Sequence, residues 1–537
     1  MLHTNLLITF TCICVIAVPA SFQLILMATS SFPQPAVIGD TYWAALAAVT
    51  VLISVFIVLR VFGSLTVRSA STQKDSSTIH DLGGYPILSA WLFFTKRYDF
   101  MCGTFKRTGQ KMFRFRVLQH HVVALSGAEG RKIFFSEKNF NMGEGYRILG
   151  GPAPKLEEIK LKPVEGGAIF VRHVLNLFRK DRIMNVIPHL LDDVNARMDG
   201  WDSHGRMDPF KEMHALVFQM TVRMGTCREL ADDSQATAHL SELFLLHEQA
   251  ASPLSLLLPW LPGFSKRNKE KATRGLFDLL SHYVALRRKS KVQSTDAIDV
   301  LIADGCDDST TIAYTLGIVF AGVINTSMNV CWNIIYLGTY PEWKERVAQE
   351  VKSLLFNHSN SSSMDPIHRR FSTVPLNAWE EEMPVLDAVI KETIRFTLSG
   401  TALRRNIGGD ITIAHKTIRD NDFLAYSLGD THFDDQIYTE PFSFNPRRFL
   451  ERWEDKSTVP FPFLGWGAGR HPCAGMRAAK LEIKLAIALF LSKFEYTVVD
   501  ASGKFPAAPP QPDRNNIHQA KPLGEPCYLK FKRVEDM

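Results

Sequence analysis

Hydrophobic residues recur at three-and-four spacing along most of the chain after residue 87, which is the repeat of amphipathic helices. Such spacing brings these side chains to one helix face, where they can be buried against a core. Strand-like pieces are short and lie mainly in the last third, such as Ile411 to Ile413 and Tyr496 to Val499. The pattern therefore predicts a mainly α fold. Helices are expected at residues 179–199, 240–249, 277–291, 342–355, 385–397 and 476–493.

One further predicted helix differs from the others, because residues 309–341 contain no charged side chain. Residues 312–337 alone would span about 39 Å as a helix, which is enough to cross a bilayer. However, Asn325, Asn329 and Asn333 fall inside the run, and unpaired polar groups are costly against lipid. We therefore expect a long helix through the centre of a soluble domain rather than a third transmembrane span.

Two uncharged stretches near the N-terminus have the composition of membrane spans. Leu6 to Met27 has no charged residue in 22 positions and Tyr42 to Leu59 has none in 18, close to the roughly 20 residues that cross a bilayer. The first is either a cleaved signal peptide or a retained span. Basic residues after the second place the following domain in the cytosol by the positive-inside rule. We expect a membrane anchor at residues 1–62, a linker at 63–82 and a catalytic domain at 83–537.

Composition and charge exclude several classes of protein. Of 537 residues, 46% are hydrophobic and 22% charged, as in ordinary globular proteins. The net charge of +6 is small and comes with no long basic run, so nucleic acid is not an expected partner. None of the cysteines past residue 100 lies within four residues of another. This spacing argues against a zinc ribbon or a dense disulfide scaffold and favours a reducing compartment.

Cys473 is the cysteine whose surroundings suggest chemistry. It follows the glycine-rich stretch FPFLGWGAGRHP and precedes the helix expected from Met476. Backbone N–H donors and the helix dipole would hold a thiolate ionised there, as metal-ligating or nucleophilic sulfurs require. Glycines such as Gly469 and Gly475 would let a flat, bulky partner approach. Taken alone, a lone cysteine in a glycine-rich loop is more often buried and inert.

Two further motifs carry charged side chains. Glu392 and Arg395 are one helical turn apart, so they can form a charge-assisted pair. Arg448, in a downstream Pro-x-Arg-Phe segment, could complete an Arg–Glu–Arg cluster. An isolated Glu-x-x-Arg is usually a solvated surface pair. The motif therefore indicates a structural cluster only in combination with the other motifs of the chain.

In order and spacing, these motifs closely resemble the cytochrome P-450 family of haem-thiolate enzymes. They are a central helix with Ala321-Gly322, then Glu-x-x-Arg, then Pro-x-Arg-Phe, then Gly-x-x-x-Cys-x-Gly. The likeness runs from about Gly83 to the C-terminus. It implies the fold of that family: a large helical domain and a small β-rich region around a buried haem, with an N-terminal transmembrane anchor.

The resemblance also implies a role for individual residues. Cys473 would be the axial ligand of the iron of haem b. Glu392, Arg395 and Arg448 would form a structural cluster. Contacts to the haem propionates are expected from His471 and from Arg404 or Arg405. The usual C-helix tryptophan is not visible, and Arg172 or His173 would take its place. The other haem-binding residues expected in the cysteine loop are Trp466, Gly469 and Gly475.

Two departures from the family pattern bear on the reaction. Trp466 stands where the cysteine loop usually begins with phenylalanine, and an indole can shield the sulfur equally well. The usual acid–alcohol pair of the central helix is replaced by Ile324-Asn325, followed by Thr326. Isoleucine cannot relay a proton, whereas asparagine can still hold a water. Both departures resemble the branch that contains the sterol 7α- and 12α-hydroxylases and prostacyclin synthase, and the cysteine loop also looks like fungal natural-product members.

The resemblance implies a monooxygenase of the endoplasmic reticulum membrane whose catalytic domain faces the cytosol. Dioxygen would be cleaved beside the segment from Ala321 to Thr326. Electrons would come from NADPH through NADPH-cytochrome reductase, a flavoprotein. The substrate would be a lipophilic terpenoid, sterol or other natural product delivered from membrane lipid, in secondary metabolism. Two alternatives stay open: an isomerase or dehydratase that acts on a peroxide without a reductase, and a non-catalytic haem-binding sensor.

Overall fold

The structure is a computed structural model that describes residues 78–149, 167–250, 264–290, 294–359, 364–451, 458–516 and 520–534. All of them belong to one unit, Asp75–Met537. The expected membrane anchor at residues 1–62, and the linker at 63–82 as far as residue 77, lie outside the described residues.

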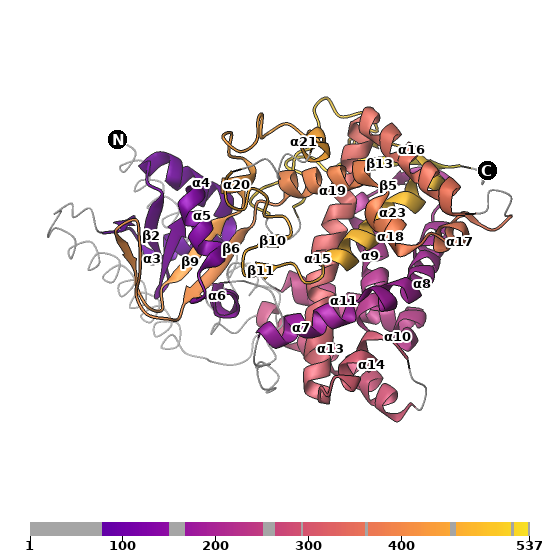
Figure 1. Cartoon of the computed structure of the whole chain (residues 1–537), viewed down its shortest axis with the longest axis horizontal. Helices are drawn as coiled ribbons and strands as arrows, with labels where there is room; N and C mark the ends of the chain where they lie inside the picture. The colour runs from indigo at the N-terminus through magenta and orange to yellow at the C-terminus, as the bar shows by residue number, and fades with distance from the viewer. Residues whose placement is uncertain are drawn as a thin grey trace, which may run out of the picture. The chain divides into compact units, whose positions relative to one another are not determined.

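Helices dominate the described chain, and each helix expected from the periodicity is present (Figure 1). Two of them, α11 and α13, begin earlier than the apolar spacing predicts, because their first turns are polar. The helices are α3 (Pro86–Thr95), α4 (Arg97–Thr108), α5 (Gly127–Ser136), α6 (Met142–Leu149), α7 (Gly167–Leu177), α8 (Lys180–Asp199), α9 (Pro209–Gly225), α10 (Arg228–Asp232), α11 (Ser234–Gln249), α13 (Phe264–Lys289), α14 (Ala297–Ala303), α15 (Asp308–Thr339), α16 (Pro341–His358), α17 (Ile367–Ser372), α18 (Leu376–Glu381), α19 (Pro384–Thr397), α20 (Gly429–His432), α21 (Arg447–Leu450) and α23 (Met476–Lys493).

Helix α15, which carries no charged residue after Asp308, runs through the middle of the helical part. It is long and apolar enough to cross a membrane, but it packs against α9, α13, α19 and α23 and most of its side chains are buried. Two of its buried asparagines find partners inside the fold: the Asn333 amide donates to Asn329 Oδ1 at 2.6 Å and accepts from the Thr393 hydroxyl at 3.2 Å. These paired amides explain how the helix carries asparagines in a buried core.

Gly322 lets α9 approach α15 closely. A Cβ built on Gly322 would lie 2.8 Å from Thr221 Cγ2 of α9, which is closer than two carbon atoms pack. The sequence predicts that Ala321-Gly322 leaves space beside the backbone. At Gly322 the neighbouring helix α9 occupies that space.

We expect Gly322→Ala to lower the free energy of unfolding by about 1–2 kcal/mol. Overpacking costs roughly 1–3 kcal/mol, which exceeds the gain of about 1 kcal/mol in helix propensity. The matched variant Thr221→Ser removes the methyl group that the new Cβ would meet. In chemical denaturation, the double variant should be at least as stable as Thr221→Ser alone. A stabilising effect of Gly322→Ala in the wild-type background would refute this assignment.

Strands contribute more of the fold than the sequence pattern suggests. Strands lie mainly in the last third, as expected, but the six-stranded sheet β1-β2-β3-β9-β6-β4 also draws four of its strands from residues 80–141. In β2 the side chains of Phe113, Phe115 and Val117 are buried and alternate with two arginines. The strands are β1 (His80–Asp81), β2 (Met112–Val117), β3 (His120–Leu125), β4 (Phe140–Asn141), β5 (His204–Met207), β6 (Thr401–Asn406), β7 (Ile411–Ile413), β8 (Lys416–Ile418), β9 (Phe423–Ser427), β10 (Gly467–Ala468), β11 (His471–Pro472), β12 (Phe494–Val499) and β13 (Tyr528–Arg533).

Both faces of the large sheet are covered. β3 pairs with β9 in parallel, β6 pairs with β9 antiparallel, and the cores on the two faces are separate apolar clusters. Successive residues of β6 therefore point into different environments. The smaller sheets are β12-β13-β5, β7-β8 and β10-β11, of which the last carries the cysteine loop.

Candidate active site

Cys473 follows directly after the hairpin of β10 and β11. Gly469 turns this hairpin with a φ of +58°, and a Cβ there would collide with the carbonyl oxygen of Phe135 at the end of α5. The Arg470 N–H donates to the same carbonyl at 3.0 Å, and the Cys473 N–H donates to the Trp466 carbonyl at 2.7 Å. These contacts hold the cysteine in place between the hairpin and α23. Nothing in the sequence pattern signals the part that α5 plays.

Two opposing effects act on the pKa of the Cys473 thiol. The residue is exposed, yet enough protein surrounds the thiol that desolvation raises its pKa. A hydrogen bond from the Gly475 N–H opposes this shift and does not cancel it. Burial and the backbone donor therefore act in opposite directions on the pKa of this thiol. A bound metal cation would hold the sulfur as a thiolate.

The middle of α15 has one uncovered face. Ala321 and Asn325 are exposed although the residues around them are largely buried, and Ile324 is half-buried beside them. The Asn325 amide Nδ2 donates to the Ala321 carbonyl at 2.9 Å, which fixes the side chain and leaves Oδ1 free to accept a hydrogen bond. Thr326 is buried, so it does not share this face with Ala321 and Asn325.

Arg404 and Arg405 lie in different surroundings, as neighbours on a strand must. Arg404 is buried over the Phe134 ring, with 5.0 Å between the guanidinium carbon and the ring centroid, and its Nε has no hydrogen-bond partner among the described residues. Burial lowers the pKa of Arg404. Arg405 instead forms an ion pair with Glu144 at 3.0 Å and donates to Asn421 at 3.1 Å. Of the two candidates for a propionate contact, the structure favours Arg404.

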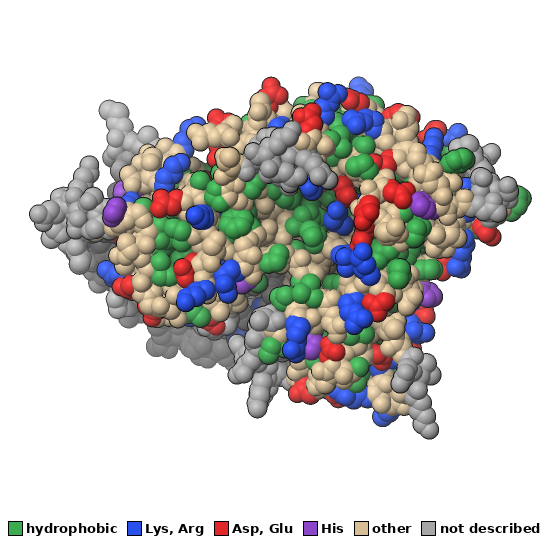
Figure 2. Space-filling view, in the orientation of Figure 1, with side chains coloured by type: hydrophobic (Ala, Val, Ile, Leu, Met, Phe, Trp, Pro, Cys, Tyr) green, Lys and Arg blue, Asp and Glu red, His purple; other side chains and the backbone are tan. Residues whose placement is uncertain are grey.

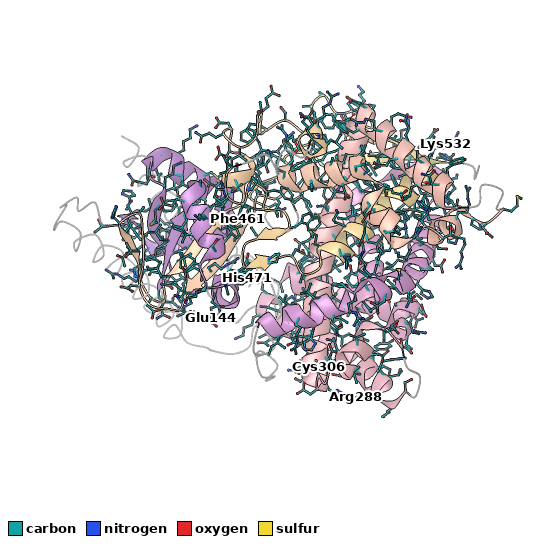
Figure 3. The ribbon with its side chains drawn as sticks, in the orientation of Figure 1. Glu144, Arg288, Cys306, Phe461, His471 and Lys532 are labelled. Atoms are coloured by element: carbon teal, nitrogen blue, oxygen red, sulfur yellow. The ribbon has the colours of Figure 1, made fainter. Side chains whose placement is uncertain are left out.

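His471 lies near Arg404. The pKa of His471 is lowered first by burial and then by the positive charges of Arg404 and Arg470. Figure 3 labels His471 at the hairpin strand β11. His173, by contrast, pairs with Asp304, since its Nδ1 lies 3.0 Å from Asp304 Oδ2. It is therefore not available for the haem contact that the sequence suggests. The site thus has two neighbouring nitrogen-bearing side chains, His471 and Arg404, and within the part of the chain that the structure describes neither of them is paired with a carboxylate.

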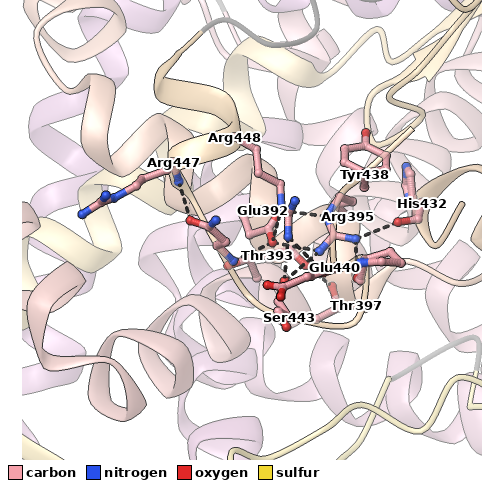
Figure 4. A network of polar contacts seen from close by, with 12 residues as sticks. Glu392, Thr393, Arg395, Thr397, His432, Tyr438, Glu440, Ser443, Arg447 and Arg448 are labelled. Atoms are coloured by element: carbon pink, nitrogen blue, oxygen red, sulfur yellow. Dashed lines mark hydrogen bonds and ion pairs between the residues drawn. The ribbon is translucent and has the colours of Figure 1, made fainter. Parts of the chain in front are cut away.

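Glu392, Arg395 and Arg448 form a cluster of ion pairs (Figure 4). Arg395 and Glu392 are fully buried and pair through two hydrogen bonds of 2.7 and 2.8 Å. Arg448 reaches Glu392 at 3.3 Å, and the Asn445 N–H donates to the same carboxylate at 2.8 Å. Arg395 also donates to the carbonyl of His432. The cluster ties α19 to the segment that leads into α21 and then to the cysteine loop.

The uncovered groups together fit one kind of ligand. A flat apolar group would lie beside the face of Ala321 and Asn325, acidic substituents would neutralise Arg404, and a metal at its centre would take the Cys473 sulfur. Figure 2 shows hydrophobic side chains near the middle of the visible face, between the sheet and the helices. These features fit haem, which is flat, apolar, dianionic at its edge and iron-bearing.

Comparison with known proteins agrees with this geometry. The family model for cytochrome P-450 matches residues 170–516. The cytochrome P-450 monooxygenase AacuE of Aspergillus aculeatus is 27% identical over 477 residues, which are 86% of this chain and 93% of that protein. The cytochrome P-450 monooxygenase nsrP of Aspergillus novofumigatus is 26% identical over 479 residues, 87% of this chain and 92% of that protein. A retinoic acid-bound cyanobacterial member superposes with a TM-score of 0.68 at 19% identity, covering 85% of this chain and 99% of that one.

The fold and the cysteine site thus define a haem-thiolate enzyme. The chain belongs to the cytochrome P-450 family, and it is an oxidoreductase of the monooxygenase type. The family carries haem with thiolate-ligated iron, and Cys473 is the residue of this chain that the family motif places at the metal.

Arg404 and Arg405 provide a matched test of which arginine holds the haem. We expect Arg404→Leu to speed the loss of haem to apomyoglobin at least tenfold, because a buried partner of an acidic group is removed. Arg405→Leu should leave that rate within twofold of wild type, since its partners are Glu144 and Asn421. Equal rates for the two variants, or a larger effect of Arg405→Leu, would contradict the assignment.

Proposed function

We propose that this enzyme hydroxylates or epoxidises a lipophilic natural product, such as a terpenoid or sterol, in secondary metabolism. The observation that carries the proposal is the uncovered face of α15, which offers Ala321, the flank of Ile324 and a single fixed amide. An apolar surface with one polar group favours a substrate of low polarity held by shape. Its fungal relatives AacuE and nsrP are named as monooxygenases, which supports the reaction class.

Haem bound at this site would supply the redox chemistry of oxygen insertion. Cys473 would hold the iron, and Arg404 and His471 would hold the acidic edge of the ring. Asn325 has no titratable proton, so its Oδ1 would position a water that delivers protons. The apolar side chain of Ile324 would exclude further water from the same face and would pack against the substrate.

We further propose that the enzyme is anchored in the endoplasmic reticulum and faces the cytosol. The support is the pair of uncharged N-terminal stretches, followed by Arg60, Arg68 and Lys74. NADPH would reach the haem indirectly, through electrons passed by a flavoprotein reductase. The branch of sterol 7α- and 12α-hydroxylases remains a proposal that rests on Trp466 and Asn325 alone.

Turnover in microsomes tests the reaction. Terpenoids and sterols that shift the haem absorption would be incubated with NADPH, reductase and isotopically labelled dioxygen. The proposal expects one labelled oxygen atom in the product and strict dependence on NADPH and reductase. Labelled product that forms without reductase, or product that carries no label, would contradict it.

A second candidate, a peroxide isomerase or dehydratase, is favoured by Ile324. A substrate that already contains an O–O bond needs no proton relay, so a side chain that cannot titrate is no handicap. This candidate expects turnover of a lipid peroxide without NADPH, reductase or dioxygen. Strict NADPH dependence would exclude it.

A further inference from the structure

A cysteine, a histidine and an aspartate meet outside the haem site, where α7 contacts the turn between α14 and α15. His173 Nδ1 lies 3.0 Å from Asp304 Oδ2, and His173 Nε2 lies 3.9 Å from Cys306 Sγ. The Asn176 amide donates to the same Asp304 oxygen at 2.8 Å. Figure 3 labels Cys306 and, near it, Arg288, whose guanidinium donates to the Cys306 carbonyl at 2.7 Å. The order of contacts is thiol, imidazole, carboxylate.

The carboxylate determines which nitrogen of His173 carries the proton. An ionised carboxylate only accepts hydrogen bonds, and the pKa of Asp304 is lowered by its hydrogen bonds from Asn176 and His173, against the opposing effect of burial. The proton of a neutral His173 therefore sits on Nδ1, and the lone pair of Nε2 faces the sulfur. Tyr314, whose ring centroid is 5.4 Å from that of His173, helps to hold the imidazole in place.

The thiol itself needs such a base. Burial and the nearby carboxylates of Asp304 and Asp307 raise the pKa of Cys306, in spite of two arginines close by. The resting side chain is therefore a thiol, and reaction requires that its proton leave as the sulfur attacks. A base that touches the sulfur and is oriented by a carboxylate is the arrangement that activates nucleophiles in covalent catalysis.

We propose that Cys306 is a nucleophilic modification site for α,β-unsaturated carbonyl compounds, with His173 as its base and Asp304 as the residue that positions His173. The sulfur forms a bond to the β-carbon of the compound, and the carbon–carbon π bond breaks. The thiol proton passes to His173 Nε2 and from there to the α-carbon. The step needs no oxidant or reductant, and it is separate from oxygen insertion at the haem.

N-ethylmaleimide is the probe, applied to the haem-loaded enzyme, with adduct formation at each cysteine followed by peptide mass spectrometry. Cys102 is the matched internal control, because it is half-buried, more open than Cys306, and its sulfur contacts the Ser427 hydroxyl rather than an imidazole. We expect Cys306 to react at least tenfold faster than Cys102. Exposure alone would give the opposite order, so a rate at Cys306 equal to or below that at Cys102 overturns the proposal.

His173→Phe keeps an aromatic ring against Tyr314 and removes the base. It should slow the reaction of Cys306 at least tenfold and leave the rate at Cys102 unchanged, while the thiolate haem spectrum stays as in wild type. An unchanged rate at Cys306 overturns the role of His173. If His173→Phe does not bind haem, Asp304→Asn at the partly exposed carboxylate replaces it. That variant should slow Cys306 threefold or more, and no change would overturn the proposal.

Discussion

Glu392→Gln should leave almost no haem-loaded enzyme in the cell. The substitution keeps the shape of the side chain but removes the charge that pairs with Arg395, whose guanidinium is fully buried. Breaking a buried ion pair from one side costs about 3–5 kcal/mol, and a domain has only about 5–15 kcal/mol of stability in total. The amount of haem protein recovered from membranes, and its unfolding temperature, measure the effect.

Glu342→Gln is the control for this prediction. Glu342 pairs with Arg447, the neighbour of Arg448, at 3.4 Å, and both side chains are more than half exposed. Such surface pairs contribute at most about 1 kcal/mol, so haem protein should be recovered at wild-type levels. If Glu392→Gln matched Glu342→Gln in recovery and in unfolding temperature, the cluster would not have the structural role assigned to it.

Cys473→Ser should lower monooxygenase turnover at least a thousandfold, equivalent to about 4 kcal/mol in the activation free energy. The hydroxyl is close in size to the thiol but would be a far poorer electron donor to iron. The electron density that a thiolate would give the iron, and that favours O–O cleavage, would therefore be lost. Product formation is measured in microsomes with reductase and NADPH, per mole of folded protein. Cys527→Ser is the control, since Cys527 is buried in the main core. Turnover of Cys473→Ser within tenfold of wild type would contradict the assignment.

Much of the fold can be predicted from the spacing of apolar residues. The uncharged run gives α15, and its asparagines indicate an interior helix because polar groups need partners that lipid does not offer. The hairpin of β2 and β3 is not among the predicted elements, although the alternation of apolar and charged residues in MFRFRV is typical of a strand. Short strands are easily overlooked beside strong helical periodicity, and the sheet that unites them is built from distant segments.

The residues of the candidate site also fall into two groups: those that local sequence motifs identify, and those whose role depends on tertiary packing. Motif spacing is enough to find Cys473, Glu392, Arg395 and Arg448, because each is fixed by local geometry and by its neighbours in sequence. Which of Arg404 and Arg405 faces the site depends on the face of β6 that the fold turns inward. The role of Gly322 likewise depends on α9, which is about a hundred residues away in sequence. Tertiary packing determines which arginine faces the site and what Gly322 contacts, and no local sequence pattern predicts either.

The reduced carbon monoxide difference spectrum tests the central claim, that Cys473 ligates haem iron, most directly. It is recorded on wild-type enzyme and on Cys473→Ala in microsomes, at matched amounts of folded protein. The account predicts a red-shifted thiolate band in the wild type and its loss in the variant. A wild-type enzyme that is folded and contains haem but lacks this band, or a variant that keeps it, would show that Cys473 is not the ligand.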